Sequence, residues 1–343
     1  MTGSSGAPVL YVTHPAFGKH QTGSLHPERV ARLRAVEQGV VDSGVSIRRL
    51  EPPPAGREML ERVHTPIYLD AIERFCRGGG GHLDPDTVAG PDSWEAAIRA
   101  AGAGSAAAGA IAASGEIRFG FLALRPPGHH ATPDRAMGFC LLNNVAVTAA
   151  SLVAEGATVA IVDWDVHHGN GTQEIFYTDP RVLYISIHQY PFYPYQGRLD
   201  EVGEGPGRGL TINIPLPAGT AGDAYLMAWN EVVEPILSQF GADWVLVSAG
   251  YDAHAEDPLA ELRLEANDYG WMAARLARLH ANKPVLAFLE GGYHLPALTS
   301  SVSATLRGLI GETPSWAAEF RSPDEAFRIV EMLKVTAREY WPL

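Results

Sequence analysis

The chain contains eight short apolar runs rich in β-branched residues, and their spacing limits what it can fold into. Each run has the length of a strand, and segments with a helical pattern separate several of them. The expected strands are 9–13, 46–50, 119–124, 159–162, 182–187, 210–214, 244–248 and 285–289. The expected helices are 96–113, 144–155, 224–240 and 267–280, the last opening with a capping-type Asn267. This alternation predicts an α/β fold with a largely parallel sheet and helices on both faces.

Composition narrows the classes of protein to which the chain can belong. No composition shift or long linker divides the sequence, so we expect a single domain over residues 1–343. The formal net charge of −13 argues against a nucleic-acid partner. No apolar run looks long enough to span a bilayer and no secretory signal is visible, so we expect no membrane partner. Two cysteines, Cys76 and Cys140, cannot form a disulfide framework, which favours a reducing, cytoplasmic location. Homo-oligomerisation stays open.

Polar residues with chemical potential follow four of the expected strands directly. These four segments are 125–131, 163–171, 249–258 and 290–294. In a parallel sheet the carboxyl ends of the strands share one edge, where open α/β sheets bind their ligands. We therefore expect the four segments to meet in one pocket.

Two acids and a histidine in these segments have the chemistry of a metal site. Asp165 and His167 are two residues apart, so on an extended backbone they point to the same side. Asp252, from another strand end, is the third candidate. Carboxylate oxygens and an imidazole nitrogen suit zinc or a neighbouring divalent transition ion. The plain alternative for any single aspartate is that it caps a helix after a strand.

Other polar residues of the same segments are candidates for catalysis. His129 and His130 are proton-transfer candidates because histidine titrates near neutral pH. Asp163 and Asn170 lie close enough in sequence to the metal candidates to orient imidazoles. Tyr293 follows two glycines, and its hydroxyl is a candidate donor to an oxyanion. The alternatives are a capped turn for the paired histidines and a structural role for the tyrosine.

Taken together, the motifs closely resemble those of the histone deacetylase superfamily, which includes bacterial histone deacetylase-like amidohydrolases and acetylpolyamine amidohydrolases. They are HPER (26–29), RPPGHHA (125–131), GFCLLNN (138–144), DWDVHHGNGT (163–172), SAGYDAHAEDP (248–258) and EGGY (290–293). The resemblance covers nearly the whole chain and implies an arginase/deacetylase-type α/β fold with an eight-stranded parallel sheet. Asn170 is similar to the class II branch, whereas class I members often have Asp there. An amide stabilises imidazolium less than a carboxylate does, so we expect a less basic His130 than with Asp at that position.

The resemblance also implies a role for individual residues. One catalytic zinc ion is implied at Asp165, His167 and Asp252. His130 is implied as general base and acid beside His129 and Asn170, with Asp163 as the partner of His129 and Tyr293 as the carbonyl-polarising tyrosine. A second, structural zinc site is not expected, because no cysteine lies near His26.

Three further groups of residues follow from the resemblance. A monovalent cation, usually potassium, is implied at Asp163, Asp165, His167, Ser186 and Ile187. An acyl-lysine tunnel is implied at Gly138, Phe139, Tyr193, Leu259 and Gly292. A rim aspartate that grips substrate amides has no clean match, and Asp84 and Asp86 are both candidates. From the residues alone, Phe139, Phe192 and Tyr193 suit core packing as well as a channel wall.

These observations lead to the hypothesis of a zinc-dependent amidohydrolase that removes acetyl groups from N-acetyl-lysine side chains of proteins or peptides. The alternatives are an acetylpolyamine amidohydrolase acting on small acetylated amines, a non-catalytic acyl-lysine-binding module and an arginase-like dinuclear hydrolase. Polyamine-selective members of the family carry either a glutamate gatekeeper or a long constricting insertion. Here Leu259 occupies the gatekeeper position and the segment 68–94 is too short for the insertion, which favours acetyl-lysine peptides.

Overall fold

Eight parallel strands form the central sheet of the computed structural model, which describes residues 7–315 and 319–343. The strands are β1 (Val9–Val12), β2 (Ile47–Leu50), β5 (Phe119–Leu122), β6 (Val159–Asp163), β7 (Val182–Gln189), β8 (Thr211–Leu216), β9 (Trp244–Ala249) and β10 (Val285–Leu289). Their order across the sheet is β2-β1-β5-β10-β9-β6-β7-β8, and every neighbouring pair is parallel. The predicted eight-stranded parallel sheet is confirmed. A separate two-stranded antiparallel pair joins β3 (Gly81–His82) to β4 (Val88–Ala89).

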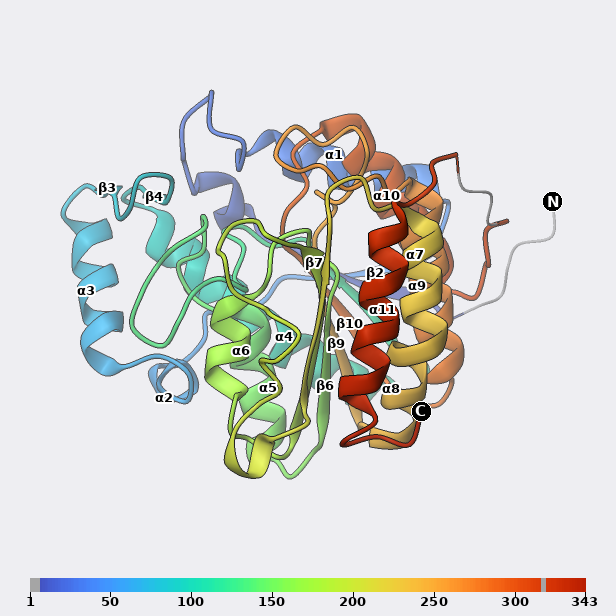
Figure 1. The fold of residues 1–343 in the computed structure, drawn as a ribbon. Coiled ribbons are helices and arrows are strands. Elements are labelled where there is room, and N and C mark those ends of the chain that lie inside the picture. The colour runs from blue at the N-terminus through green and yellow to red at the C-terminus, as the bar shows by residue number, and fades with distance from the viewer. Residues whose placement is uncertain (1–6, 316–318) are drawn as a thin grey trace.

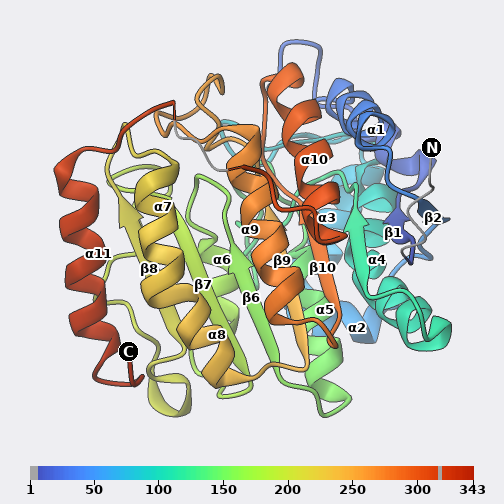
Figure 2. The ribbon, with the colours of Figure 1, turned by 90° about the vertical axis from the view of Figure 1, so that its right-hand side faces the viewer.

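Helices cover both faces of the sheet, as Figures 1 and 2 show from two directions. One face carries α2 (Arg57–Glu61), α3 (Pro66–Arg77), α4 (Ser93–Ser114), α5 (Asn144–Ala154) and α6 (Asn170–Phe176). The other carries α1 (Ala31–Ser43), α7 (Gly222–Ala228), α8 (Glu234–Phe240), α9 (Ala266–Leu279), α10 (Leu295–Leu309) and α11 (Asp324–Ala337). Apolar side chains from each layer pack on the sheet, so the core is divided in two by the strands.

Two details of the expected helices are wrong. The segment 224–240 is not one α-helix, because a π-helical turn, η3 (Trp229–Val233), separates α7 from α8. Asn267 does not cap α9; the N-cap is Glu265, whose side chain forms a reciprocal capping box with Asp268. Glutamate is an unusual N-cap, and the carboxylate three residues later supplies the second half of the box.

The expectation that no apolar run is long enough to span a bilayer is contradicted by one helix. Helix α4 has 22 residues, and its length and composition alone would allow it to cross a membrane. However, 56% of its most apolar window is buried within the protein. At Gly104 an added Cβ would overlap the side chains of Thr148 and Phe288, so the helix lies very close to the sheet and α5. Helices rich in small apolar residues are also common in the buried cores of proteins, so length and composition do not decide between the two.

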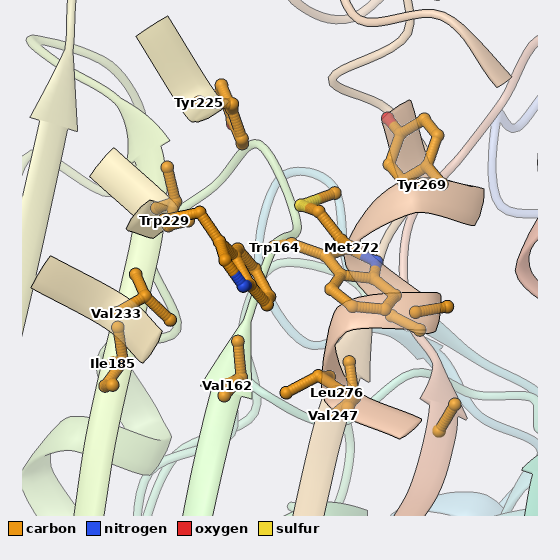
Figure 3. Close-up of a cluster of buried hydrophobic side chains, with 14 of the residues drawn as sticks. Val162, Trp164, Ile185, Tyr225, Trp229, Val233, Val247, Tyr269, Met272 and Leu276 are labelled. Atoms are coloured by element: carbon orange, nitrogen blue, oxygen red, sulfur yellow. The ribbon is translucent and has the colours of Figure 1, made fainter. Parts of the chain in front are cut away.

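Trp164 lies between Asp163 and Asp165 at the carboxyl end of β6, and its burial determines which way the two acids point. Figure 3 shows Trp164 between Trp229 of η3 and Met272 of α9, in the core on the α7–α11 face. Successive side chains of an extended strand point to opposite faces, so burying Trp164 turns Asp163 and Asp165 away from this core. Hydrophobic packing therefore sets the direction of both acids.

A buried charged cluster ties the N-terminal segment to two of the strand ends. The Glu28 carboxylate accepts hydrogen bonds from Arg125 (Nη2, 2.7 Å) and Arg32 (Nη1, 3.2 Å), and all three side chains are fully buried. Arg32 also donates to the carbonyl oxygens of Glu290 and Gly292. Burial alone would raise the pKa of Glu28, but the neighbouring cations lower it to about 2.

Glu28→Gln is expected to destabilise the fold by about 3–5 kcal/mol, because it leaves two buried guanidinium groups without their counter-charge. Urea denaturation measures the change in the free energy of unfolding, with Glu58→Gln as the control because the Glu58 side chain is 92% exposed. Since the Glu28 carboxylate titrates below its unfolded-state range, its stabilisation should persist above that range and disappear as the pH falls through about 2. A loss of less than about 1 kcal/mol would contradict the assignment.

Candidate active site

Four neighbouring strands at the centre of the sheet carry the four polar segments at their carboxyl ends. These strands are β5, β10, β9 and β6, adjacent in that order. The expectation that the segments share one edge is therefore confirmed. Residues of three of these segments, 125–131, 163–171 and 290–294, line a cavity of about 500 Å³, and Leu259, which directly follows the fourth segment, lines it as well. Its wall consists of Leu25, His26, Pro27, Pro85, Asp86, Pro127, His129, His130, Gly138, Phe139, Cys140, His167, Phe192, Tyr193, Leu259, Gly291 and Tyr293.

Beside this cavity, where His167 forms part of the wall, the structure brings together Asp165, His167 and Asp252. One ligand-type atom from each residue lies within 4.8 Å of the others. His167 Nδ1 is 3.1 Å from Asp165 Oδ1 and 3.2 Å from Asp252 Oδ2. Burial opposes charge on the imidazole, but the two carboxylates outweigh it and raise the pKa of His167 to about 10. Two acids thus converge on a single imidazole nitrogen.

The donor atoms of this cluster fit a divalent transition ion. Asp252 Oδ2 is buried and lies 3.2 Å from His167 Nδ1 without a well-oriented hydrogen bond among the described residues, whereas Oδ1 accepts from the backbone N–H of Val166 (3.0 Å). A buried carboxylate oxygen without a well-formed hydrogen bond is costly unless a cation compensates it. Two carboxylates and one imidazole also match the usual oxygen and nitrogen ligands of zinc. The assignment of the three residues as metal ligands stays a prediction.

Two glycines allow the strand ends to approach these carboxylates. An added Cβ at Gly250 would overlap the carboxylate of Asp165, and one at Gly291 would overlap that of Asp252. The Gly291 backbone N–H instead donates to Asp165 Oδ2 (2.8 Å). Neither requirement was anticipated from the sequence, since each depends on a residue distant along the chain.

The tandem histidines each pair with the partner named above. His129 Nδ1 lies 3.0 Å from Asp163 Oδ2, and His130 Nδ1 lies 2.8 Å from Asn170 Oδ1. Burial lowers the pKa of His130 well below its usual value, and the charge on His129 adds to that effect. For His129, burial is outweighed by the carboxylates of Asp163 and Asp165, which raise its pKa to about 10. The surroundings therefore shift the pKa values of the two rings in opposite directions, upward for His129 and downward for His130.

Aromatic residues form the wall of the cavity rather than the hydrophobic core. Phe192 stacks on His167 with ring centroids 5.4 Å apart, and Tyr193 meets His130 edge-on at 5.3 Å. Phe139 lies edge-on to Tyr293 at 5.8 Å. The interpretation of these aromatics as core residues is wrong.

The remaining members of the predicted tunnel divide between wall and support. Gly138 and Leu259 line the cavity. An added Cβ at Gly138, where φ is +55°, would overlap the His130 ring. Gly292 is not among the described residues of the wall, where its neighbour Gly291 lies instead. The Gly292 carbonyl accepts a hydrogen bond from the buried Arg32 side chain (2.7 Å).

The structure distinguishes the two candidate rim aspartates. Asp86 lines the mouth of the cavity, whereas Asp84 closes its own turn by accepting from the backbone N–H of Thr87 (2.6 Å). His26 holds this turn in place through a hydrogen bond between its Nε2 and the Asp86 carbonyl (2.9 Å). Of the two, Asp86 is the one that lines the cavity, and its role at the rim stays a prediction.

The residues predicted for a monovalent cation are buried side by side. Ser186 of β7 is in register with Asp163 of β6, and its hydroxyl pairs with His188 Nδ1 (2.9 Å). Ile187 follows in the same strand and is fully buried. The potassium site itself stays a prediction.

Two acids in the motifs support the site in ways that sequence reasoning missed. Glu290 Oε2 accepts from the backbone N–H groups of Gly128 (2.7 Å) and His129 (3.2 Å). Asp257 Oδ2 accepts from the backbone N–H of Tyr293 (2.6 Å). For Glu290 the signal in the sequence was an acid directly after a buried run, which does not identify a backbone partner, and Asp257 lacked even that signal.

Comparison with known proteins adds independent findings. The sequence pattern described as "Histone deacetylase domain" matches residues 26–309. A "Probable deacetylase" of Archaeoglobus fulgidus is 38% identical over 96% of this chain and 98% of its own length. "Histone deacetylase 15" of Arabidopsis thaliana is 41% identical over 92% of this chain and 59% of its own length. A solved structure, "Crystal Structure of HDA15 HD domain", superposes with a TM-score of 0.91 at 36% identity, covering 98% of this chain and 96% of that one.

Proposed function

Because the chain belongs to the histone deacetylase family, we propose that it is a zinc-dependent amidohydrolase that releases acetate from N-acetyl-lysine side chains of proteins or peptides. The observation that carries the proposal is the cluster of Asp165, His167 and Asp252, which meets an aromatic-walled cavity through His167. His130 and Tyr293 border the same cavity, so acid–base and oxyanion groups stand beside the metal candidates.

The chain's own residues suffice to move the protons of the reaction. Asp165, His167 and Asp252 would hold the ion, which when bound supplies Lewis-acid polarisation and lowers the pKa of water. The Asn170 carbonyl oxygen accepts the Nδ1 proton of His130, which leaves the other ring nitrogen free to act as base. His130 removes a proton from the attacking water and later delivers it to the departing amine.

Tyr293 and the aromatic wall of the cavity would stabilise the transition state and enclose the substrate. The Tyr293 hydroxyl donates a hydrogen bond to the oxygen that becomes negatively charged as water adds to the amide carbon. The C–N bond then breaks, and acetate and the free amine result. Phe139 and Tyr193 surround the acyl-lysine stem and exclude bulk water, which strengthens each electrostatic contact.

The alternatives receive less support. Among the described residues, one cluster of three or more potential metal-ligating side chains is found, whereas a dinuclear hydrolase needs a second. A non-catalytic acyl-lysine reader would not need the proton-transfer pair His130 and Asn170. We further propose that the chain forms a single catalytic domain. Its two buried, unpaired cysteines support a reducing, cytoplasmic compartment. The buried neighbours Asp163 and Ser186 support a structural potassium ion.

The substrate class is tested by a panel of acetyl-lysine peptides and acetylated polyamines. Leu259 lines the cavity and carries no charge for a distant ammonium, and Leu25, Pro27 and Pro85 make its mouth apolar. We expect kcat/KM for the peptides to exceed that for acetylputrescine or acetylspermidine by about tenfold or more, equivalent to about 1.4 kcal/mol of transition-state binding. Leu259→Glu should shift the preference toward the polyamines. Equal or reversed efficiencies for the unaltered protein would favour the acetylpolyamine alternative.

A further inference from the structure

One buried carboxylate connects two of the loops around the cavity. It belongs to Asp257, in the loop after β9. Its Oδ2 accepts from the backbone N–H groups of Tyr293 (2.6 Å) and His294 (3.1 Å). Its Oδ1 accepts from the backbone N–H of Leu259 (3.1 Å). A single side chain therefore binds three backbone donors, two of which belong to the turn that carries Tyr293.

The loop that carries Asp257 is itself firmly anchored. The Asp257 backbone N–H donates to the carbonyl of His254 (2.8 Å). Two further hydrogen bonds close the base of the loop, from the Ala255 N–H to the Leu264 carbonyl (2.8 Å) and from the Leu264 N–H to the Ala253 carbonyl (2.9 Å). Asp257 is therefore a fixed acceptor for the neighbouring turn.

The residues before Tyr293 do not by themselves fix the direction of its side chain. The Gly291 N–H donates to Asp165 Oδ2 (2.8 Å), and the Gly292 carbonyl accepts from Arg32 (2.7 Å). Gly292, however, has a φ of +115°, and glycine restricts its own backbone less than any other residue does. The orientation of Tyr293 therefore depends on contacts beyond the two glycines.

These further contacts divide between the Tyr293 ring and its backbone. The Arg32 guanidinium lies 5.1 Å from the ring centre, and Phe139 meets the ring edge-on at 5.8 Å. Neither contact is a hydrogen bond, so the ring can shift along its own plane while both persist. The bonds from Asp257 instead act on the backbone of Tyr293 and of His294, the N-cap of α10, whose own side chain does not cap the helix. Asp257 thus holds the backbone from which the Tyr293 hydroxyl extends.

The three backbone donors stabilise the ionised form of Asp257. Burial raises the pKa of this carboxyl to about 7, and the negative charge of Asp252 adds to the effect, whereas the three N–H groups lower it. Measurements at a pH above this value therefore examine the carboxylate.

We propose that Asp257 is the positioning residue for Tyr293, because it fixes the turn so that the Tyr293 hydroxyl meets the carbonyl oxygen of the bound amide. The inference rests on the proposed deacetylase function. Asp257 does not line the cavity among its described residues, so it acts through the turn and not on the substrate. Loss of its acceptor oxygens should lower kcat while the metal candidates and His130 stay in place.

Three substitutions of Asp257 differ in the acceptor that they leave. Asp257→Ala removes both oxygens and is expected to lower kcat for a small N-acetyl-lysine substrate by about 10²-fold, the effect of misplacing a reacting group by about 1 Å, with little change in KM. Asp257→Asn keeps one carbonyl oxygen, which can accept from both Tyr293 and His294, and should retain most of the activity. Asp257→Ser places its hydroxyl too close to the backbone to replace Oδ2, so it should resemble the alanine variant and replaces it if that variant does not fold.

A double-mutant cycle separates positioning of Tyr293 from a general effect on the fold. If Asp257 acts through the Tyr293 hydroxyl, Asp257→Ala should lower kcat little further in a Tyr293→Phe background, whereas independent effects multiply. The same fold loss of kcat in both backgrounds would overturn the proposal.

A second measurement does not depend on activity. Hydrogen–deuterium exchange of the substrate-free protein should be faster over 290–295 in Asp257→Ala and close to normal in Asp257→Asn. Glu256→Gln, an exposed change at the adjacent position, is the matched control and should alter neither exchange nor kcat. Unchanged exchange in Asp257→Ala would overturn the positioning contact. Absence of deacetylase activity in the unaltered protein would instead contradict the proposed function, and the exchange result would still test the contact.

Discussion

Replacing Asp252 with alanine is expected to abolish both bound metal and deacetylase activity. Among the described residues, Asp252 Oδ2 is the carboxylate oxygen of the cluster that forms no well-oriented hydrogen bond; its polar neighbour is His167 Nδ1 at 3.2 Å, so a cation would supply its missing partner. With only Asp165 and His167 left, the usual three-ligand requirement of a catalytic zinc site is not met. Metal analysis by mass spectrometry after purification, alongside an acetyl-lysine assay, measures both effects.

The control for this variant lies in the same loop. Glu256→Ala removes an exposed acid four residues away and should leave the metal content and activity unchanged. Thermal unfolding of both variants separates loss of metal from loss of fold. Full metal occupancy in a folded Asp252→Ala protein would show that the ion, if one binds, is held elsewhere.

Tyr293→Phe is expected to lower kcat by about 10²–10³-fold, the usual effect of deleting one oxyanion donor. Phenylalanine should keep the edge-on contact with Phe139 at 5.8 Å and the position of the Arg32 guanidinium 5.1 Å from the ring centre. Because only the hydroxyl is removed, metal content and KM should change little. Steady-state kinetics on an acetyl-lysine peptide, with metal content measured on the same sample, provides the test.

Tyr195→Phe makes the same chemical change at an exposed tyrosine and serves as its control. It should retain the activity of the unaltered protein. A Tyr293→Phe variant with nearly normal kcat would reduce Tyr293 to a structural residue, as the plainer interpretation of a Gly-Gly-Tyr turn holds.

The sheet was predictable because its strands are continuous apolar runs, which is what burial on both faces requires. The polar residues at the strand ends could be grouped because parallel strands bring their carboxyl ends to one edge of the sheet. Helices α1, α3 and α10 were not among the expected helices; of these, α3 begins with a capping side chain, that of Thr65, whereas the N-caps of α1 and α10 make no such hydrogen bond. The boundaries of α1 and α10 depend on packing against each other, which a single sequence does not display.

The supporting contacts of the site were harder to predict than its reactive groups. Asp165 and His167 are recognisable because their chemistry is unusual and their spacing is regular. Glu290 and Asp257 act on backbone groups of distant loops, and a backbone N–H has no signature in the sequence. The same holds for Gly291, whose missing side chain matters only beside the carboxylate of Asp252.

The burial of Trp164 between the two acids has a consequence for how the site responds to an ion. Since hydrophobic packing already directs Asp163 and Asp165, these carboxylates need little conformational ordering when a cation arrives. Stripping the metal with a chelator should therefore leave the secondary structure and cooperative unfolding intact, unlike the collapse of small domains whose fold depends on their ion. Reloading should then be fast and reversible, since the empty and filled proteins would share one backbone.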